Sequence, residues 1–356
     1  MAVLTEEQTM IRDMAREWAD NESPLTAWRK VRNAAPPEGY DRAVWTSQAE
    51  MGWAGILIPE EFGGVGMGYL SLGLVLEQLG RNLSATPLAA TAAATSAILL
   101  GGSDAQKAAW LPRIARGEVV ATVAFDEGPN FAPGKVATTV SGGKLTGTKA
   151  FVAEGDSAQL FVVSAVDGVY LVENGEGVTR SHRALADARS HAEVRFDGAA
   201  AEALSDGTDL VTQVADRAAV ACAAEMLGLA ESAFAITNDY LKVRVQFGQV
   251  LASFQALQHR MAKMFTELEL MRSAVEGALE AVDAGRSDVV QSASLAKALA
   301  GDTAKLVSRE MIQLHGGIGM TDEHDAGFFL KRSAVLEAMW GNAAYHRERF
   351  ARLNGY

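Results

Sequence analysis

The apolar positions at the start of the chain recur with the period of an α-helix. Leu4, Ile11, Met14 and Trp18 follow one another at intervals of seven, three and four residues, with charged residues between them. This spacing places the four side chains on one helical face, so it predicts an amphipathic first helix. The same periodicity makes residues 4–115 mostly helical.

Two further segments of this region are apolar enough to predict buried helices. Residues 70–80 end at Gly80, and a glycine after an apolar run is typical of a helix C-cap. Residues 89–100 are rich in alanine and carry no charge. Ser103 can cap the N-terminus of the next helix, and we expect Pro112 to interrupt or end that helix.

Beyond this helical region, the pattern changes to short β-type runs joined by tight turns. Two pairs of runs flank Asp167–Gly168 and Ser141–Gly142–Gly143, and both of these sequences are typical of β-hairpin turns. Further runs lie at 119–125 and 192–197. Hairpins without helices between them indicate an antiparallel sheet rather than a βαβ arrangement, and we place this β-domain at residues 118–204.

The last part of the chain is helical again. Apolar stripes with helical period cover residues 220–235, 254–282 and 289–314, which predicts a four-helix bundle. The predicted fold class is therefore α+β. Its three expected domains are an N-terminal helical domain (1–117), a middle antiparallel β-domain (118–204) and a C-terminal helical bundle (205–356).

Composition and charge narrow the class of protein. Of 356 residues, 49% are hydrophobic and 21% are charged, which is ordinary for a folded globular protein. The net charge of −12 argues against binding to nucleic acid or to an anionic membrane. The start of the chain has no signal-peptide pattern, and no uncharged apolar run reaches the roughly 20 residues of a membrane span. We therefore expect a cytoplasmic protein.

Cysteine and histidine usage points away from disulfides and metals. Cys222 is the single cysteine, and its alanine-rich surroundings predict a small buried hydrophobe rather than a nucleophile. The six histidines show no paired-ligand spacing, so no metal is expected.

Two segments near the C-terminus combine residue types that suit a nucleotide cofactor. An arginine can bind a pyrophosphate through its donor fork, an amide can bind a hydroxyl or an adenine edge, and glycines let the backbone approach a ligand closely. The segments contain Arg244, Phe247, Gly248, Phe254 and Gln255, and then Gln313, Gly316 and Gly317. Taken alone, the glycine cluster is better explained as a simple turn between two helices.

Together with residues 50–66 and 111–118, these two segments resemble the acyl-CoA dehydrogenase family, and the resemblance runs nearly from end to end. It implies that FAD accepts a hydride while an acyl-CoA thioester is dehydrogenated between its α- and β-carbons. It also implies a tetrameric assembly, an electron-transfer acceptor, and a role in FAD binding for the eight residues just named.

The resemblance also shows that the expected catalytic base is missing. The family removes the proton beside the thioester carbonyl with a glutamate, and its two possible positions correspond here to Ala218 and Trp340. Neither side chain can accept a proton. Asp216, Glu225 and Glu337 lie nearby, but each is better explained as a solvated or salt-bridged helix residue. Asp216 is the strongest of these three weak candidates.

The segments that hold the flavin ring in the family differ as well. Residues 125–133 keep Glu127 but lack the family's hydroxyl donors, and Phe151–Val152–Ala153 replaces a Trp-Ile-Thr strand. Family assemblies divide each FAD site between subunits, and this chain keeps the set that reaches over to its neighbour. We therefore expect one subunit of a two-gene α2β2 enzyme, of the kind associated with steroid side chains or similarly bulky acyl groups, whose partner supplies the base. The alternatives are a self-sufficient homotetramer that uses a non-standard carboxylate such as Asp216 and a flavin-free scaffold subunit.

Overall fold

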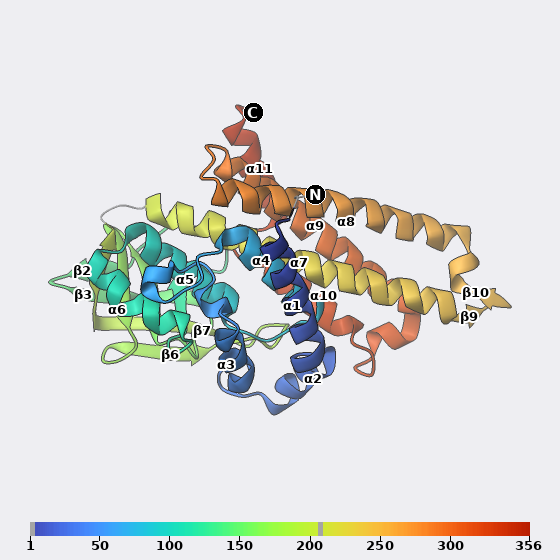
Figure 1. The fold of residues 1–356 in the computed structure, drawn as a ribbon, viewed down its shortest axis with the longest axis horizontal. Helices are drawn as coiled ribbons and strands as arrows, with labels where there is room; N and C mark the ends of the chain where they lie inside the picture. Colours follow the sequence, from blue (N-terminus) through green and yellow to red (C-terminus); the bar gives the residue numbers. More distant parts are fainter. Residues whose placement is uncertain (1–3, 206–208) are drawn as a thin grey trace. The chain divides into compact units, whose positions relative to one another are not determined.

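The computed structural model describes residues 4–205 and 209–356, which form two compact units (Figure 1). Residues 1–3 and 206–208, near the starts of the predicted N- and C-terminal domains, lie outside the described residues. The first unit comprises Met1–Trp28, Gly73–Ser84 and Ala219–Tyr356, and the second comprises Arg29–Leu72 and Ala85–Ala218. The predicted α+β fold class is confirmed, because helical N- and C-terminal parts enclose a β region in the sequence.

The first unit is built from helices. Helix α1 (Glu6–Glu22) begins with a capping box between Thr5 and Gln8 and buries Trp18, as the apolar spacing predicts. The other helices of the unit are α4 (Gly68–Arg81) from Gly73 onward, α7 (Asp209–Val243) from Ala219 onward, α8 (Gln255–Asp283), α9 (Val289–His315), α10 (Ala326–Ala338) and α11 (Ala343–Leu353).

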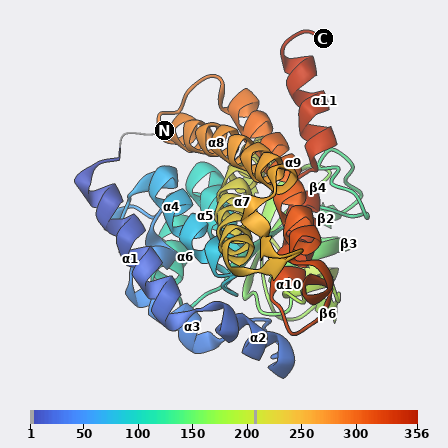
Figure 2. The ribbon, with the colours of Figure 1, turned by 90° about the vertical axis from the view of Figure 1, so that its right-hand side faces the viewer.

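Helix α9 is the centre of the C-terminal helices. It packs against α8, α10 and α11, and Figure 2 shows α8 and α9 side by side. Its buried positions include Ala293, Ala296, Ala300, Ala304 and Val307, which recur at three- or four-residue intervals. Small side chains on this face let the neighbouring helices approach closely. The helical stripes predicted at 254–282 and 289–314 are thus confirmed.

Glycines also set the crossing of α4 and α7. A Cβ added at Gly228 would lie 1.7 Å from the carbonyl oxygen of Glu77, and one added at Gly80 would lie 2.2 Å from that of Glu225. Both glycines therefore allow backbone-to-backbone contact that no larger residue permits. Helix α7 is long and apolar enough to span a membrane by composition, but 78% of its most apolar stretch is buried inside the protein. This burial is typical of a core helix.

The second unit combines helices with two sheets. The helices are α2 (Leu25–Ala34) from Arg29 onward, α3 (Arg42–Glu50), α5 (Leu88–Gly101) and α6 (Asp104–Ala115), with short 3₁₀ helices η1 (Trp53–Gly55) and η2 (Glu60–Phe62). The strands are β1 (Ala121–Ala124), β2 (Thr139–Ser141), β3 (Lys144–Ala153), β4 (Leu160–Ala165), β5 (Gly168–Glu173), β6 (Val178–His182), β7 (His191–Ala200) and β8 (Glu202–Ser205). Their order is β1-β4-β5-β8 in one sheet and β2-β3-β7-β6 in the other.

Both predicted hairpins are present, but the prediction of a purely antiparallel β-domain is wrong. β2 pairs with β3, and β4 pairs with β5, antiparallel in both cases. β1, however, pairs with β4 in parallel, with Ala121 opposite Leu160. A hairpin turn identifies only the pairing of two strands that follow each other along the chain. Here the β2–β3 hairpin intervenes and joins the other sheet, so the chain returns to β1 in the same direction.

The expected effect of Pro112 is also wrong. Ser103 and Gln106 form the capping box that starts α6, as predicted, but the helix continues past Pro112 to Ala115. Proline removes only the hydrogen bond to the carbonyl four residues earlier. Because Pro112 lies in the last turn, the helix loses one bond and continues to Ala115, and Gly117 follows with φ +69°.

Candidate cofactor-binding site

A short hairpin at the end of α7 carries the first predicted cofactor segment. β9 (Val245–Gln246) and β10 (Gln249–Val250) pair antiparallel around a turn formed by Phe247 and Gly248 (Figure 1). Both turn residues have positive φ, 54° and 82°, as a type I′ hairpin turn requires. This conformation is costly for an aromatic residue, yet the Phe247 side chain is 90% exposed. A strained and exposed aromatic at a hairpin tip indicates contact with another molecule.

Arg244 lies at the base of this hairpin and is free to bind an anion. Its N–H donates to the carbonyl of Tyr240 (2.9 Å), and its own carbonyl accepts from the N–H of Leu251 (2.8 Å). These bonds fix the backbone. The guanidinium itself is exposed, and no carboxylate of the described residues forms an ion pair with it.

The rest of the first segment leads into α8. The short 3₁₀ helix η3 (Leu251–Ser253) is followed by Phe254, whose ring meets that of Phe247 edge to face at 6.2 Å. Gln255 is exposed and begins α8, and no side chain caps this helix start. The uncapped N–H groups and the helix dipole make this end favourable for negative charge.

The second predicted segment lies at the end of α9. Gln313 is exposed on the last turn, and Gly316 ends the helix with φ +65° before the 3₁₀ helix η4 (Gly316–Met320). A Cβ added at Gly316 or Gly317 would meet no atom of the described residues within 4 Å. The backbone there is therefore open to a ligand.

The two predicted segments meet through a pair of stacked rings. The rings of Tyr240 and His315 are 4.3 Å apart and nearly parallel, and the Tyr240 hydroxyl donates to the His315 carbonyl (3.3 Å). Tyr240 lies one helical turn before Arg244, and His315 directly precedes Gly316. The exposed guanidinium, the open glycine backbone and the uncapped helix start fit a dinucleotide pyrophosphate, so the residues present suit FAD.

The structure places the three substitute carboxylates in different surroundings. Glu225 is buried and forms an ion pair with Arg332 at 2.7 Å, as the salt-bridge interpretation predicts. Glu337 is half-buried and accepts from the N–H of Ala343. Asp216 is buried on the part of α7 that belongs to the second unit.

Ala218 and Trp340, the two positions that the resemblance aligns with the family's glutamate, are both apolar. Ala218 is buried, and Trp340 is half-buried just after α10 with φ +58°. The turn around Trp340 is held by buried groups. Lys297 Nζ donates to the carbonyls of Glu337 (3.0 Å) and Gly341 (2.9 Å), and His346 Nε2 donates to that of Trp340 (2.8 Å).

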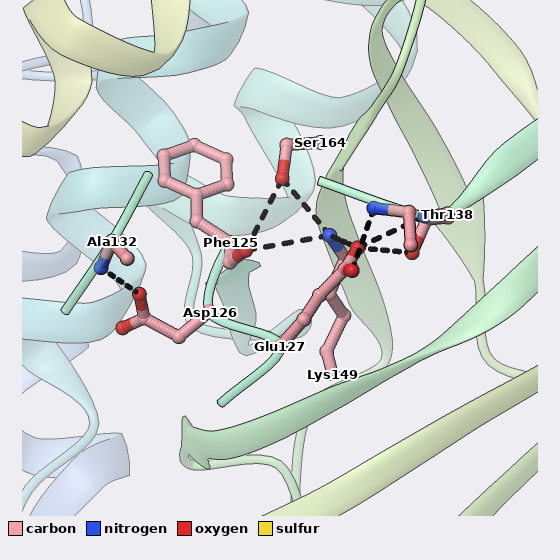
Figure 3. A network of polar contacts seen from close by, with 8 residues as sticks. Phe125, Asp126, Glu127, Ala132, Thr138, Lys149 and Ser164 are labelled. Carbon is pink, nitrogen blue, oxygen red and sulfur yellow. Dashed lines mark hydrogen bonds and ion pairs between the residues drawn. The ribbon is translucent and has the colours of Figure 1, made fainter. Parts of the chain in front are cut away.

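A buried ion pair that the sequence did not suggest anchors residues 125–138 of the second unit (Figure 3). Lys149 is fully buried, and its Nζ lies 2.7 Å from Glu127 Oε1, 3.0 Å from Ser164 Oγ and 3.3 Å from the Phe125 carbonyl. Burial alone would raise the pKa of Glu127, but hydrogen bonds from Lys149, Thr138 and the Ala137 backbone lower it to about 2. Glu127 is therefore ionised, and its carboxylate accepts hydrogen bonds from Lys149 and Thr138.

Phe151, two residues after Lys149 on β3, has an unusual backbone conformation. This residue, which the resemblance aligns with the tryptophan of the family's ring-holding strand, has φ +50° and is 44% exposed. It lies within an irregularity of the β3–β7 pairing, between Lys149 and Val152. The bulge explains how an aromatic residue leaves the sheet and points outward.

Two other features lie apart from the predicted cofactor residues. Cys222 is buried, as predicted, and burial raises the pKa of its thiol to about 11, so it is no nucleophile.

Hollows of about 380 and 510 Å³ lie in the second unit and share Pro37, Asp156 and Arg180. None of the eight predicted cofactor residues lines either hollow.

Several known proteins are similar to this chain over most of its length. Residues 5–118 match the family described as "Acyl-CoA dehydrogenase, N-terminal domain", and residues 205–353 match "Acyl-CoA dehydrogenase, C-terminal domain". The acyl-CoA dehydrogenase IpdE2 of Mycolicibacterium smegmatis is 32% identical over 332 residues, which cover 93% of each chain. The acryloyl-CoA reductase (NADH) of Anaerotignum propionicum is 29% identical and covers 98% of this chain and 94% of its own.

A solved structure agrees with these relatives. The protein described as the Tcur3481–Tcur3483 steroid ACAD G363A variant is 30% identical, covers 98% of both chains and superposes with a TM-score of 0.90. Sequence and fold therefore lead to the same assignment: this chain belongs to the acyl-CoA dehydrogenase family, whose members are oxidoreductases that act on CH–CH bonds.

Proposed function

We propose that this chain is one subunit of a cytoplasmic two-gene α2β2 acyl-CoA dehydrogenase, in which it grips the nucleotide part of FAD while a homologous partner subunit supplies the catalytic base. The observation that carries the proposal is a contrast within one chain. Arg244, Gly316 and Gly317, which suit the cofactor phosphates, are exposed, whereas Ala218 and Trp340, which the resemblance aligns with the family's base, have apolar side chains.

The cofactor contacts follow from the geometry of the hairpin and the diglycine loop. Arg244 would donate its guanidinium fork to the pyrophosphate, next to the uncapped start of α8. Gly316 and Gly317 would let the backbone approach the same ligand, and the amides of Gln255 and Gln313 would bind its hydroxyl or adenine edges. When bound, FAD supplies the acceptor for the hydride and passes electrons on to an electron-transfer acceptor.

The missing base explains why a partner is needed. Removal of a weakly acidic proton next to a thioester carbonyl requires a carboxylate close to the α-carbon in a site that excludes water. Ala218 and Trp340 have no carboxylate, and the carboxylate of Glu225 forms an ion pair with Arg332. A second chain that retains the family glutamate would complete the site.

The known relatives support the substrate class. IpdE2 is named as an acyl-CoA dehydrogenase, and the solved relative pairs two named chains and is described as a steroid enzyme. A bulky, steroid-derived acyl-CoA is accordingly the substrate class that we propose for the assembly.

Co-expression tests this function directly. The chain is purified alone and together with the product of a neighbouring homologous dehydrogenase gene, and flavin absorbance and acyl-CoA oxidation are measured. We expect a colourless, inactive chain alone and a yellow, active complex. A yellow and active preparation of the single chain would refute the need for a partner.

The buried carboxylate of Asp216 supports one alternative, a self-sufficient homotetramer. In that case Asp216→Asn would abolish the activity of the chain purified alone. A flavin-free scaffold is the other alternative, and it requires that Arg244→Ala change neither flavin content nor turnover of any complex.

A further inference from the structure

Three rings connect the two segments that we assign to the cofactor. Tyr240 of α7 stacks on His315 at 4.3 Å, and the ring of His324 lies 4.4 Å from His315 at a tilt of 47°. His324 Nδ1 accepts from the N–H of Ala326, the first residue of α10. His315 directly precedes the loop that contains Gly316 and Gly317, and His324 follows it. The contact between these two rings therefore joins the start of the loop to its end.

His315 holds one defined tautomer in this cluster. Its Nδ1 lies 2.7 Å from the Met311 carbonyl, which can only accept, so Nδ1 carries the proton and Nε2 has a lone pair. Nε2 is buried and has no hydrogen-bond partner among the residues that the structure describes. Burial lowers the pKa of His315, the hydrogen bond to the Met311 carbonyl opposes this shift, and the neighbouring His324 lowers the pKa further.

An unsatisfied buried nitrogen has a cost that a plain aromatic or aliphatic side chain would avoid. Two interactions of the His315 ring offset this cost. The ring stacks on Tyr240, and its Nδ1–H ties it to the last turn of α9. Both interactions act at the residue that directly precedes Gly316, where the chain turns with positive φ.

We propose that His315 is a positioning residue, which fixes the Arg244 hairpin and the Gly316–Gly317 loop relative to each other so that both bind the same dinucleotide. The proposal rests on the proposed function, since it concerns FAD binding at that site. Tyr240 transmits the constraint, because its carbonyl accepts the Arg244 N–H and its hydroxyl donates to the His315 carbonyl.

Preorganisation is the physical benefit. A loop or side chain that is already ordered in the free protein loses less conformational entropy when a ligand binds. Removal of the stack should leave Arg244 and the two glycines intact but let them move independently. The expected consequence is weaker flavin binding, with a much smaller effect on folding.

The test uses the flavin-containing assembly with two variants and one matched control. Tyr240→Leu removes the stack, and Tyr240→Phe keeps the ring while removing the hydroxyl. Phe234→Leu removes an aromatic partner of Phe265 from the same helix, away from the cluster. We expect Tyr240→Leu to raise the FAD dissociation constant roughly threefold to tenfold, Tyr240→Phe to retain most of the affinity, and Phe234→Leu to change only the unfolding temperature.

A second variant keeps the test decisive if Tyr240→Leu does not fold. His315→Asn retains an N–H near the Met311 carbonyl but removes the ring, and it should weaken flavin binding to the same extent as Tyr240→Leu. An FAD dissociation constant for both variants equal to that of Phe234→Leu would overturn the positioning role.

Combination with Arg244→Ala separates the inference from the function on which it rests. If Tyr240 acts by placing Arg244, the losses of affinity in Arg244→Ala and Tyr240→Leu are less than additive in the double variant. Additive losses contradict the positioning role. If Arg244→Ala alone leaves flavin binding unchanged, the proposed function itself fails.

Discussion

His346 of α11 is a buried histidine beside the turn that carries Trp340. Burial lowers its pKa to about 4, although the hydrogen bond to the Trp340 carbonyl acts in the opposite direction. An unfolded histidine titrates near pH 6.5. Between these two values the unfolded chain binds a proton that the folded chain excludes, so the free energy of unfolding falls as the pH falls from 6.5 to 4.

His346→Gln should flatten this dependence. Each pKa unit corresponds to about 1.4 kcal/mol, so the wild-type protein should lose up to about 3 kcal/mol over this range that the variant does not lose. Urea unfolding at several pH values measures the slope, and His259→Gln, which replaces an exposed histidine, controls for the loss of an imidazole. Equal slopes for the wild type and His346→Gln would contradict the assignment.

Lys149 tests the value of a buried ion pair in the second unit. Lys149→Met leaves the carboxylate of Glu127 largely enclosed without its cation, and we expect a loss of about 3 kcal/mol in the free energy of unfolding. The matched control is Arg286→Met, which breaks an exposed pair with Asp288 and should have a much smaller effect, because solvent screens exposed ion pairs. Chemical denaturation distinguishes the two, and similar losses in both variants would show that the buried network contributes little.

At the scale of elements, the glycines of the helix crossings make a sharper prediction. Gly228→Ala forces a methyl group against the Glu77 carbonyl of α4, so the helices must separate at a cost of about 1–3 kcal/mol or more. Gly277→Ala, in the middle of α8, meets no atom within 4 Å and should stabilise the protein by up to about 1 kcal/mol. Thermal unfolding of the two variants should move in opposite directions, and a shared direction would contradict the close contact between α4 and α7.

Some elements were predictable because their causes are local. The hairpin turns at Asp167–Gly168 and Ser141–Gly142–Gly143, the cap at Ser103 and the helical stripes depend on residues close in sequence. The parallel pairing of β1 with β4 depends on residues about 39 positions apart, as between Ala121 and Leu160. No local pattern contains that information.

The features of the candidate site were likewise predictable only where they depend on residues close in sequence. The cofactor residues were found as sequence motifs, and whether they bind FAD is still a prediction. The contacts that organise them were missed, because Tyr240 and His315 are 75 positions apart. Lys149 was missed for a similar reason: only its partner, Glu127, lay in a segment that the resemblance singled out, and a lysine in a strand usually faces solvent.

For the whole molecule, the exposed hairpin tip predicts dependence on another chain. Phe247→Asn places a residue that tolerates positive φ at a strained position, so the unfolding temperature of the single chain should not fall. The same change removes an exposed ring of the cofactor segment, which by the proposed function reaches over to the partner subunit, so complex formation with the partner should weaken. Val166→Asn, another exposed apolar position, is the control, and sedimentation velocity is the measurement. Unchanged assembly in Phe247→Asn would remove the hairpin from the interface.

The central claim is that this chain binds FAD for a site whose base belongs to another subunit. The most direct measurement is the ratio of flavin to protein, determined from absorbance for the chain alone, for the mixed assembly and for the mixed assembly with Arg244→Ala. We expect no flavin with the chain alone, bound flavin in the mixed assembly and a clear reduction with Arg244→Ala. Full flavin occupancy in the chain alone, or flavin content that does not respond to Arg244→Ala, would contradict it.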